Sequence, residues 1–358
     1  MRRSLPAIDR SVLYALGAAF LFALSVPAGK LLLGRVGPLG LSALCYLGGG
    51  LGLLLYKLLS GGAAGQAKEA PLEKKDLPYI IGFVAAGGAL APAFLFTGLK
   101  LASSSAASLM LNFELVFTAV IAVVVFREHG GRRLWLAAGL ITAGGIALAL
   151  EPGGFSFQPG LALVALASLF WAVDNNLTAK VSLKDPLTLS VIKGLAGGCV
   201  NAALAFYSGE ALPAPKTALL ALGLGFVSYG VSLALLVRAM RGLGAGRAGA
   251  FFGVYPFLGT ALSCLWLGEA FSLRLGLAFA LTGAAAALLL GEKHAHAHTH
   301  EPLEHDHLHG HDAHHAHPHP GGADGPGEHS HPHTHEKLEH SHGHGPDAHH
   351  RHEHGGGG

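Results

Sequence analysis

The amino-acid sequence predicts an all-α membrane protein with ten transmembrane helices, arranged as two inverted five-helix repeats and followed by a disordered histidine-rich tail. Three observations lead to this prediction. Only 13% of the 358 residues are charged, and several apolar runs reach the ~20 residues that a helix needs to cross a bilayer. The two halves of the apolar region resemble each other, which indicates a duplication. After Lys293 the composition changes and histidines become dense.

The composition excludes several classes of protein. A mean hydropathy of +0.45 is too high for a soluble domain, and a net charge of +2 is too small to suggest nucleic-acid binding. Cys45, Cys199 and Cys264 lie in apolar runs without CxxC spacing, so we interpret them as packing residues. The sequence contains no nucleophile–base pair, phosphate-binding loop or dinucleotide motif, so we expect neither an enzyme nor a required cofactor.

The predicted spans divide the chain into a first repeat at residues 1–151, a second repeat at residues 152–292 and a tail at residues 293–358. The spans are expected at about residues 12–33, 39–59, 78–99, 104–126, 133–150, 159–179, 187–208, 217–239, 245–267 and 273–291. The first apolar run lacks a small-residue cleavage site, so we interpret it as a retained span and not as a signal peptide.

The basic residues predict the orientation of the spans. If the N-terminus is cytoplasmic, most lysines and arginines fall in cytoplasmic segments, and the outer segments hold Arg35, Lys100, Lys216 and Arg274. This asymmetry follows the positive-inside rule, and it predicts a multi-pass protein of the cell (inner) membrane with both termini in the cytoplasm. Because five spans per half is an odd number, the second half must insert upside down relative to the first.

The duplication is clearest where the fourth predicted span aligns with the ninth. This alignment places Glu128 on Glu269 and Glu114 opposite Tyr255. Each half ends in a helix rich in small residues, then a glutamate, then a last helix that contains glycine. The residues that carry this pattern are Phe117, Phe126, Arg127, Glu128, Gly139 and Gly144 in the first half, and Pro256, Phe257, Leu267, Gly268, Glu269, Gly276 and Gly283 in the second.

The chain therefore resembles the EamA-type transporters of the drug/metabolite transporter (DMT) superfamily over about residues 1–291. The resemblance implies a ten-span secondary transporter of small metabolites, and it implies no particular substrate. Leu115 stands where the second half has Pro256, so it is left open whether the fourth span is broken like the ninth. The glutamates of the pattern are expected to bond neighbouring chain ends and not to bind substrate.

Glu114 and Asn112 lie near the middle of the fourth predicted span. A carboxylate at the centre of a membrane helix costs about 2.5–3.5 kcal/mol, so it normally faces a protein interior or a water-filled cavity. We interpret Glu114 as a group that binds a proton or a cation in a central cavity, with Asn112 beside it. The alternative is a structural carboxylate that is hydrogen-bonded to Asn112, Ser108 or a cationic side chain.

Four further polar residues of the second half are candidates for contact with a substrate. Asp174, Asn175 and Asn176 lie in the sixth span, where they would either bind polar groups of a substrate or form interhelical hydrogen bonds. Lys193 lies about two turns into the seventh span. It would either pair with Asp174 or Glu114, or extend to the cytoplasmic interface, and the second interpretation is favoured.

Aromatic residues within the spans are the remaining candidates. Trp171, Tyr229 and Tyr255 each combine an apolar ring with a polar tip, so they suit the wall of a pocket, although ordinary packing is the favoured role for any one of them. Tyr255 precedes Pro256, where a broken helix would expose backbone carbonyls. Arg247, at the start of the ninth span, is interpreted as a positive-inside anchor rather than an anion contact.

The tail is defined by its histidines. All of the 24 histidines except His129 lie between His294 and His354. Few residues here are able to form a core, so the segment is expected to be disordered. Imidazole is a good ligand for zinc, nickel, cobalt and copper, so we expect metal binding without a unique site, or else a solvated tail without a cellular role. The densest runs contain His294, His296, His298, His300, His329, His331, His333 and His335.

Two functions compete. The first is an exporter of small metabolites or drugs that works by alternating access around a central polar cavity, with proton coupling as an option. The second is a divalent transition-metal transporter or metal-regulated carrier that uses the tail, and a related third reading is a membrane-bound metal sensor. The predicted spans contain no histidine, which favours the exporter. The expected partners are the lipid bilayer, a small-molecule substrate and a divalent metal at the tail, and the oligomeric state is left open.

Overall fold

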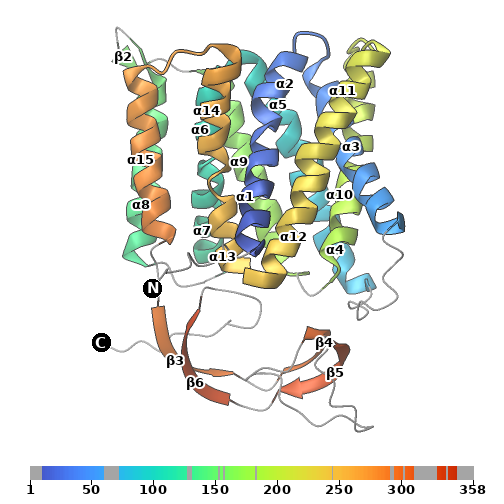
Figure 1. Cartoon of the computed structure of the whole chain (residues 1–358), viewed down its shortest axis with the longest axis vertical. Coiled ribbons are helices and arrows are strands. Elements are labelled where there is room, and N and C mark those ends of the chain that lie inside the picture. The colour runs from blue at the N-terminus through green and yellow to red at the C-terminus, as the bar shows by residue number, and fades with distance from the viewer. Residues whose placement is uncertain are drawn as a thin grey trace, which may run out of the picture.

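The structure is a computed structural model, and it describes residues 10–59, 72–126, 131–151, 154–155, 158–181, 184–243, 245–290, 294–300, 303–309, 329–335 and 338–344. Up to residue 290 this part is almost entirely helical, and the helices run roughly along the long axis of the molecule (Figure 1). Among the described residues, seven helices are long and apolar enough to cross a membrane, and shorter apolar helices cover Tyr255–Leu267 and Leu273–Leu288.

The first half contains α1 (Arg10–Ala23), α2 (Ser25–Leu32), α3 (Pro38–Leu59), η1 (Lys74–Asp76), α4 (Leu77–Phe83), η2 (Val84–Leu90), α5 (Ala91–Leu101), α6 (Ser104–Met110), α7 (Phe113–Val124) and α8 (Arg132–Ala149). The second half contains α9 (Pro159–Ala179), α10 (Pro186–Tyr207), α11 (Pro215–Gly225), η3 (Phe226–Val231), α12 (Ser232–Leu243), α13 (Ala245–Phe252), α14 (Tyr255–Leu267) and α15 (Leu273–Leu290). The short strands β1 (Leu150–Glu151) and β2 (Gly154–Phe155) pair between the halves.

The ends of the helices follow from local sequence signals. Several helices begin at a proline, which lacks the N–H that a first helical position leaves unpaired anyway. The carboxylate of Asp185 caps α10 by accepting a 3.0 Å hydrogen bond from the backbone N–H of Leu187. Gly268 ends α14 with φ = 65°, a left-handed conformation that glycine adopts without strain. This turn directs the chain toward Glu269.

Irregular helical segments recur at corresponding places in the two halves. Two π-helical segments, η2 and η3, interrupt the third and the eighth predicted spans. The fourth predicted span is broken between α6 and α7 at Leu111 and Asn112, and the ninth is broken between α13 and α14 at Gly253 and Val254. The fourth span is therefore broken although it lacks a proline equivalent to Pro256, which answers the question that the sequence left open.

Small residues set how closely the helices pack. The α-carbon of Gly225, at the end of α11, lies so close to α3 that a side chain there would meet the carbonyl oxygen of Cys45 at 2.0 Å. On the other side of α3, Gly50 and Gly194 of α10 face each other backbone to backbone. Without water inside the membrane, such close packing is a main source of helix association.

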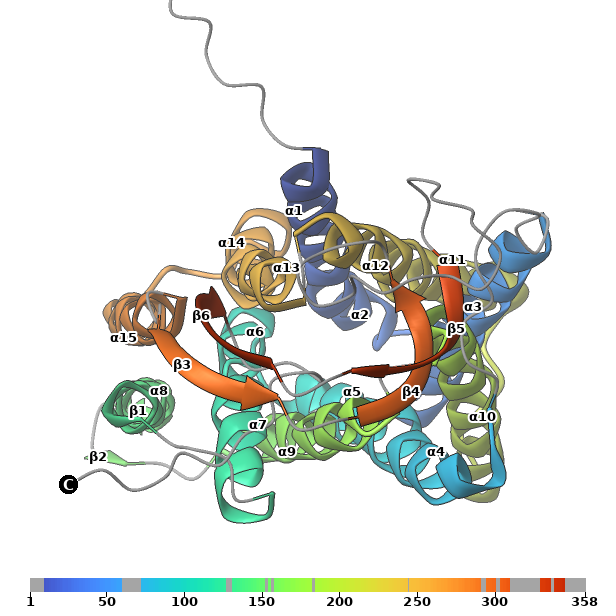
Figure 2. The same cartoon turned by 90° about the horizontal axis from the view of Figure 1, so that it is seen from below.

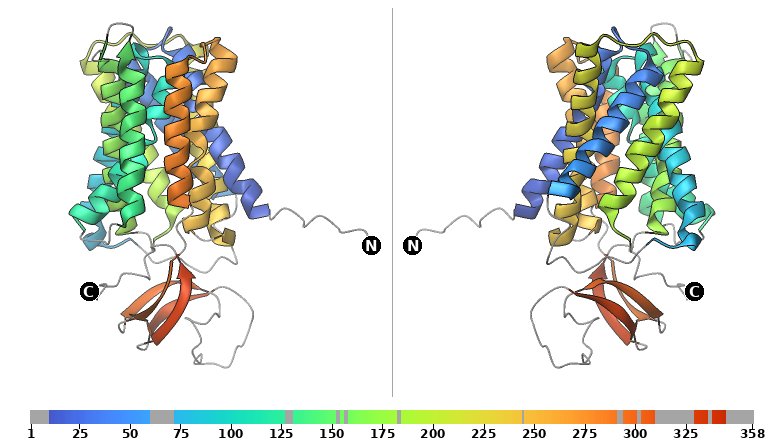
Figure 3. Two further views of the ribbon diagram at one scale, coloured as in Figure 1. Left: turned by 90° about the vertical axis from the view of Figure 1, so that its left-hand side faces the viewer. Right: turned by 90° about the vertical axis from the view of Figure 1, so that its right-hand side faces the viewer.

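The arrangement of the helix ends is visible in Figures 1 and 3. The start of α1 and the end of α15 lie at one end of the bundle, and β1 and β2 lie at the opposite end. Seen along the bundle, α8 and α15 stand side by side at one edge, and α4 and α10 stand at another (Figure 2). We refer to the end that holds the start of α1 as the terminal end, and to the other as the hairpin end.

Within the predicted tail, the described residues form four strands, namely β3 (His294–His300), β4 (Leu303–His309), β5 (His329–His335) and β6 (Leu338–His344). The disorder of the tail as a whole stays a prediction. β3 pairs with β6 and β4 pairs with β5, both antiparallel. The alternation of histidine with small and polar residues has the two-residue period of a strand, which explains how this composition adopts extended pairing. The side chains of the tail histidines lie outside what the structure describes.

Candidate functional site

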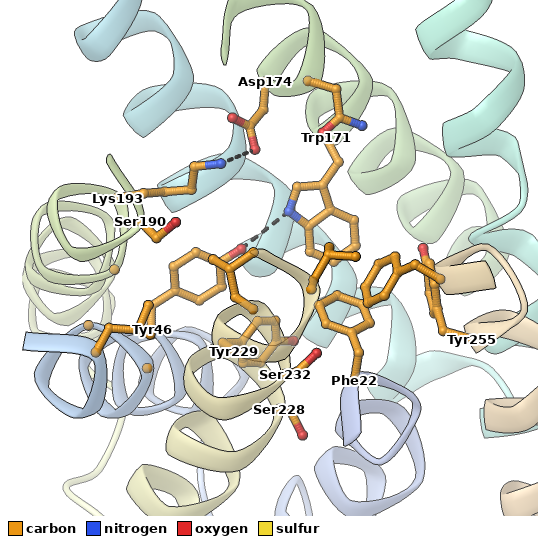
Figure 4. A pocket seen from close by; sticks show the side chains of 18 of the residues that line it. Phe22, Tyr46, Trp171, Asp174, Ser190, Lys193, Ser228, Tyr229, Ser232 and Tyr255 are labelled. Atoms are coloured by element: carbon orange, nitrogen blue, oxygen red, sulfur yellow. Dashed lines mark hydrogen bonds and ion pairs between the residues drawn. The ribbon is translucent and has the colours of Figure 1, made fainter. Parts of the chain in front are cut away.

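A cavity of about 210 Å³ lies among α1, α3, α7, α9, α10, η3, α12, α13 and α14, so that both halves of the chain contribute to its wall. Seven of the predicted site residues line it: Glu114, Asn175, Asp174, Lys193, Trp171, Tyr229 and Tyr255. Figure 4 shows the cavity from close by, with aromatic rings along its wall and an ion pair at one side. The structure thus brings together residues that are far apart in the sequence.

The ion pair joins α9 to α10. Lys193 Nζ lies 2.7 Å from Asp174 Oδ2 (Figure 4). Thr178 donates a 3.0 Å hydrogen bond to Asp174 Oδ1. The Asp174 side chain is only 4% exposed and that of Lys193 is 25% exposed. The favoured prediction that Lys193 extends to the membrane interface is therefore wrong. A charge pair inside the bundle compensates both ions better than a lysine that leaves a buried carboxylate alone.

Two adjacent glycines of η2 make this pair possible. A side-chain carbon at Gly87 would lie 2.0 Å from Asp174 Oδ2, and one at Gly88 would lie 3.1 Å from the carbonyl oxygen of Lys193. The π-helical segment packs on both α9 and α10. Segments of this kind often occur at functional sites, where they shift the helix backbone toward the site.

Glu114 has a different environment. Its Oε1 accepts a 2.8 Å hydrogen bond from Asn175 Nδ2, and its Oε2 accepts a 3.0 Å hydrogen bond from the Tyr255 hydroxyl. Among the described residues, no lysine or arginine lies within ion-pair distance of this carboxylate. The half-buried Glu114 is therefore held by neutral donors alone.

The contact between Glu114 and Tyr255 joins corresponding positions of the two halves. The two residues are 141 positions apart, which is the same spacing that separates Glu128 from Glu269 in the sequence repeat. A direct hydrogen bond between a residue and its own counterpart places both near the centre of the duplicated structure. The cavity lies at this centre.

A second chain of hydrogen bonds runs from α9 to η2. Trp171 Nε1 donates to the Tyr46 hydroxyl over 3.2 Å (Figure 4). This hydroxyl donates in turn to the carbonyl oxygen of Gly87 over 2.8 Å. The Trp171 and Tyr46 side chains thus have satisfied polar tips and present their rings to the cavity. These bonds fix the ring orientations, as is usual for buried tryptophan and tyrosine.

Sequence reasoning missed part of the cavity wall. The missed residues with aromatic or hydroxyl side chains are Phe22, Tyr46, Ser190, Ser228, Ser232 and Phe252. Tyr46 carries a signal that could have found it, because it is an isolated tyrosine in an apolar span, like Tyr229 and Tyr255. The rings pack edge to face, with centroids 4.8 Å apart for Phe22 and Tyr255 and 5.4 Å apart for Phe22 and Tyr229.

Two predicted site residues do not line the cavity. Asn112 is 1% exposed at the break between α6 and α7, where its Nδ2 donates a 2.9 Å hydrogen bond to the carbonyl oxygen of Leu109. Asn176 Nδ2 donates to the carbonyl oxygens of Ala172 and Thr118, so it joins α9 to α7. Both amides satisfy backbone groups, and the interhelical interpretation applies to Asn176.

The glutamate of the repeat pattern behaves as expected where it is described. Glu269 accepts 2.7 Å hydrogen bonds from the backbone N–H groups of Ser104 and Ser105 at the start of α6. Its counterpart Glu128 and the side chain of Arg247 lie outside the described residues. Within the described part, no group of three or more metal-ligating side chains occurs.

Comparisons with known proteins agree with this architecture. The sequence model of the EamA-like transporter family matches residues 9–150 and again residues 158–291, so the chain belongs to this family. An "Uncharacterized transporter" of Methanothermobacter thermautotrophicus is 28% identical over 275 residues, which cover 73% of this chain and 80% of the relative. The "Uncharacterized transporter YdfC" of Bacillus subtilis is 27% identical over 228 residues, which cover 62% of this chain and 71% of the relative.

The fold also occurs among solved structures. One that is titled only "Crystal structure of protein" superposes with a TM-score of 0.59 at 21% sequence identity, covering 79% of this chain and 96% of its own. Together the family and the apolar helices define a multi-pass membrane transporter of small substrates, and not an enzyme. The double match agrees with the duplication found in the sequence.

Proposed function

We propose that the protein is a secondary transporter that exports small organic metabolites by alternating access around the central cavity. The observation that carries this proposal is the position of Glu114, which lines the cavity and is hydrogen-bonded to its own counterpart in the repeat. Secondary transporters that are built from repeats have their substrate and coupling-ion sites at the interface between the repeats, near the centre of the bundle. Glu114 is a polar group at this place. The protein is proposed to lie in the cell (inner) membrane, with both termini cytoplasmic.

The proposal includes ten spans in two inverted halves, and the helix contacts support it. In the repeat, the span of α1 corresponds to that of α9, and the span of α5 corresponds to that of α12. The contact of α1 with α12 therefore has its counterpart in the contact of α9 with α5, and both are present. α3 packs on α10, α6 packs on α14 and α8 packs on α15, so each of these spans contacts its own counterpart. The π-helical segments and the broken spans follow the same correspondence.

Contacts at the hairpin end support a conformation that is closed on that side. Lys30 donates to two carbonyl oxygens at the end of α5, each over 2.6 Å. Glu210 accepts from two N–H groups at the start of α3, and Glu269 accepts from two at the start of α6. Each charge has the sign that the helix terminus favours.

The lining of the cavity extends toward the terminal end of the bundle. Leu53, Ser190 and Leu236 lie in the parts of α3, α10 and α12 that are nearer to the terminal end. With cytoplasmic termini, the described conformation would therefore be open toward the cytoplasm and closed toward the outside. An exporter loads its substrate in this conformation.

The test is uptake of a panel of metabolites into inside-out membrane vesicles with an imposed proton gradient. We expect gradient-dependent uptake of at least one compound by the parent, and loss or uncoupling of this uptake in Glu114→Gln. Glu73→Gln is the matched control, because Glu73 is a half-exposed carboxylate outside the cavity. Parental rates with an unchanged pH dependence in Glu114→Gln would assign Glu114 a structural role and remove proton coupling through this residue.

For the tail we propose accessory binding of zinc, nickel, cobalt or copper. The strand register supports this, because it places His294, His296 and His298 opposite His344, His342 and His340. Neighbouring positions of an antiparallel pair lie within about 4.5–5.5 Å of each other, which suits shared metal ligation. We expect zinc titration of the full chain to show binding that is lost on truncation at Lys293. Equal zinc binding by both chains would exclude the tail as the ligand, and unchanged cellular metal content would exclude metal transport.

A further inference from the structure

We infer that the cavity binds a small organic monocation, namely an amine that carries an aromatic or apolar body and no carboxylate. This inference rests on the proposed transport function and names the chemical class of its substrate. It is carried by three properties of the cavity: its charge, its aromatic wall and its size.

The charge of the wall is not balanced. Among the described residues, the acidic and basic side chains that line the cavity are Glu114, Asp174 and Lys193. Lys193 is matched by Asp174 at 2.7 Å, whereas within the same set Glu114 has only the neutral donors Asn175 and Tyr255. An ionised Glu114 therefore leaves one uncompensated negative charge inside the bundle. A bound cation offsets the energy of that charge most directly.

The aromatic wall suits the rest of such a ligand. Six aromatic rings line the cavity, contributed by Phe22, Tyr46, Trp171, Tyr229, Phe252 and Tyr255. The faces of aromatic rings attract ammonium groups, and they also provide apolar contact for a ring or a short alkyl chain. Ser228 also lines the cavity, and its Oγ has no hydrogen-bond partner among the described residues.

The size of the cavity limits the ligand to a small molecule. Its volume of about 210 Å³ is below the ~300–1,000 Å³ of pockets for drug-sized ligands. A single ring with a short aminoalkyl chain is of the appropriate size. The cavity in this conformation is too small for a multi-ring drug.

The ion pair argues against a carboxylate on the ligand. The carboxylate of Asp174 already occupies Lys193, and Thr178 holds its second oxygen. Lys193 has further N–H donors, but its single positive charge is already matched by Asp174, whose side chain is 4% exposed. A ligand carboxylate would either displace Asp174 and leave it buried without its cation, or add a second negative charge beside it. An amine avoids both outcomes, whereas an amino acid or an organic acid does not.

A matched series of ligands tests the inference. Phenethylamine, phenylalanine, 3-phenylpropionate and 2-phenylethanol share one aromatic body and differ in charge. Binding of each to the purified full-length protein is measured by titration calorimetry in detergent. We expect phenethylamine to bind at least tenfold more tightly than phenylalanine, and 3-phenylpropionate to bind most weakly. Equal or tighter binding of phenylalanine, 3-phenylpropionate or 2-phenylethanol, or no binding of phenethylamine, overturns the inference.

Variants assign the binding to this cavity. Glu114→Gln should weaken phenethylamine binding at least tenfold and leave 2-phenylethanol binding within a factor of two, whereas Glu73→Gln should change neither. Equal phenethylamine affinity in Glu114→Gln overturns the assignment to Glu114. If Glu114→Gln does not fold, as judged by gel filtration and thermal unfolding, the ranking of the four ligands by the parent protein still decides the ligand class.

Transport of the same series separates this inference from the proposed function. Each compound is assayed by counterflow in proteoliposomes that contain the parent protein. Transport of another member of the series without transport of phenethylamine supports a transporter and overturns the amine inference. Binding of phenethylamine without movement of any compound supports the amine site and contradicts the transport function.

Discussion

At the scale of residues, the two carboxylates of the cavity differ in what compensates their charge. Asp174 has Lys193 and Thr178, and a glycine of η2 gives it room. Glu114 has an amide and a phenol. The first arrangement fixes a permanent ion pair between α9 and α10, and the second leaves a carboxylate available to a proton or a cation. This difference, and not the mere presence of two acidic residues, defines the site.

The ion pair gives a prediction about stability. Lys193→Met should lower the free energy of unfolding by about 3–5 kcal/mol, because it leaves the buried Asp174 without a cation. The double variant Asp174→Asn/Lys193→Met should recover part of this loss, because both charges are then absent. Thermal unfolding of the parent, the single variants Lys193→Met and Asp174→Asn, and the double variant in one detergent measures the coupling. If the double variant loses as much free energy of unfolding as the two single variants lose together, the two residues do not interact.

The residue scale is also where sequence reasoning was weakest. The sequence indicated that Glu114, Asp174 and Lys193 lie within spans, because charged residues stand out in apolar runs. It could not show that Lys193 reaches Asp174, because this depends on the room left by Gly87 on a different helix. Tyr46 could have been named as a candidate, as an isolated tyrosine in an apolar span, but its hydrogen bond with Trp171 depends on the packing of α3 against α9 and could not be read from the sequence.

At the scale of elements, corresponding helices of the two halves are built in the same irregular way. η2 and η3 are π-helical and α6–α7 and α13–α14 are broken, although the two halves differ in their prolines. At the break between α6 and α7, the backbone N–H of Leu111 donates to the carbonyl oxygen three residues earlier. At the break between α13 and α14, the N–H of Val254 does the same. The duplication therefore preserved the course of the backbone where it did not preserve the residue that usually breaks a helix.

Close helix contacts at glycines give a second prediction. Gly225→Ala should destabilise the protein by about 1–3 kcal/mol, because the added carbon would lie 2.0 Å from the carbonyl oxygen of Cys45 and α11 would have to move from α3. Gly223→Ala is the matched control on the same helix, because nothing lies within 4 Å of its added carbon. Thermal unfolding in detergent compares the two. Similar stability of both variants would show that α11 is not held against α3 at this contact.

At the scale of the whole molecule, the two ends of the bundle differ. Charged side chains bind helix termini at both ends, as Lys30 at the end of α5 and Asp185 at the start of α10 show, but the cavity lining extends only toward the terminal end. Under the proposed inverted arrangement, exchange of the two halves would convert this conformation into its opposite. The proposed alternating access consists of this exchange.

The orientation gives a third prediction, which tests the inverted arrangement. In a parent with Cys45, Cys199 and Cys264 replaced, a cysteine at Leu212 should react with a membrane-impermeant thiol reagent in intact cells. Leu212 is 94% exposed and lies between α10 and α11 at the hairpin end. A cysteine at Glu73, beside α4 at the terminal end, should react only after the membrane is opened. Labelling of both positions from the same side would contradict the proposed topology.

The sequence by itself determined the membrane class, the approximate spans, the duplication and the family. These depend on the hydrophobicity of continuous runs and on a repeated order of residues, which are local properties of the chain. It did not determine the extended pairing in the tail, where low apolar content suggested disorder. Only the tertiary structure decided which polar groups share one cavity and which charge remains unpaired. Those facts depend on contacts between helices that are far apart in the sequence, such as Glu114 and Tyr255, 141 residues apart. Such contacts form only where small residues let the helices approach.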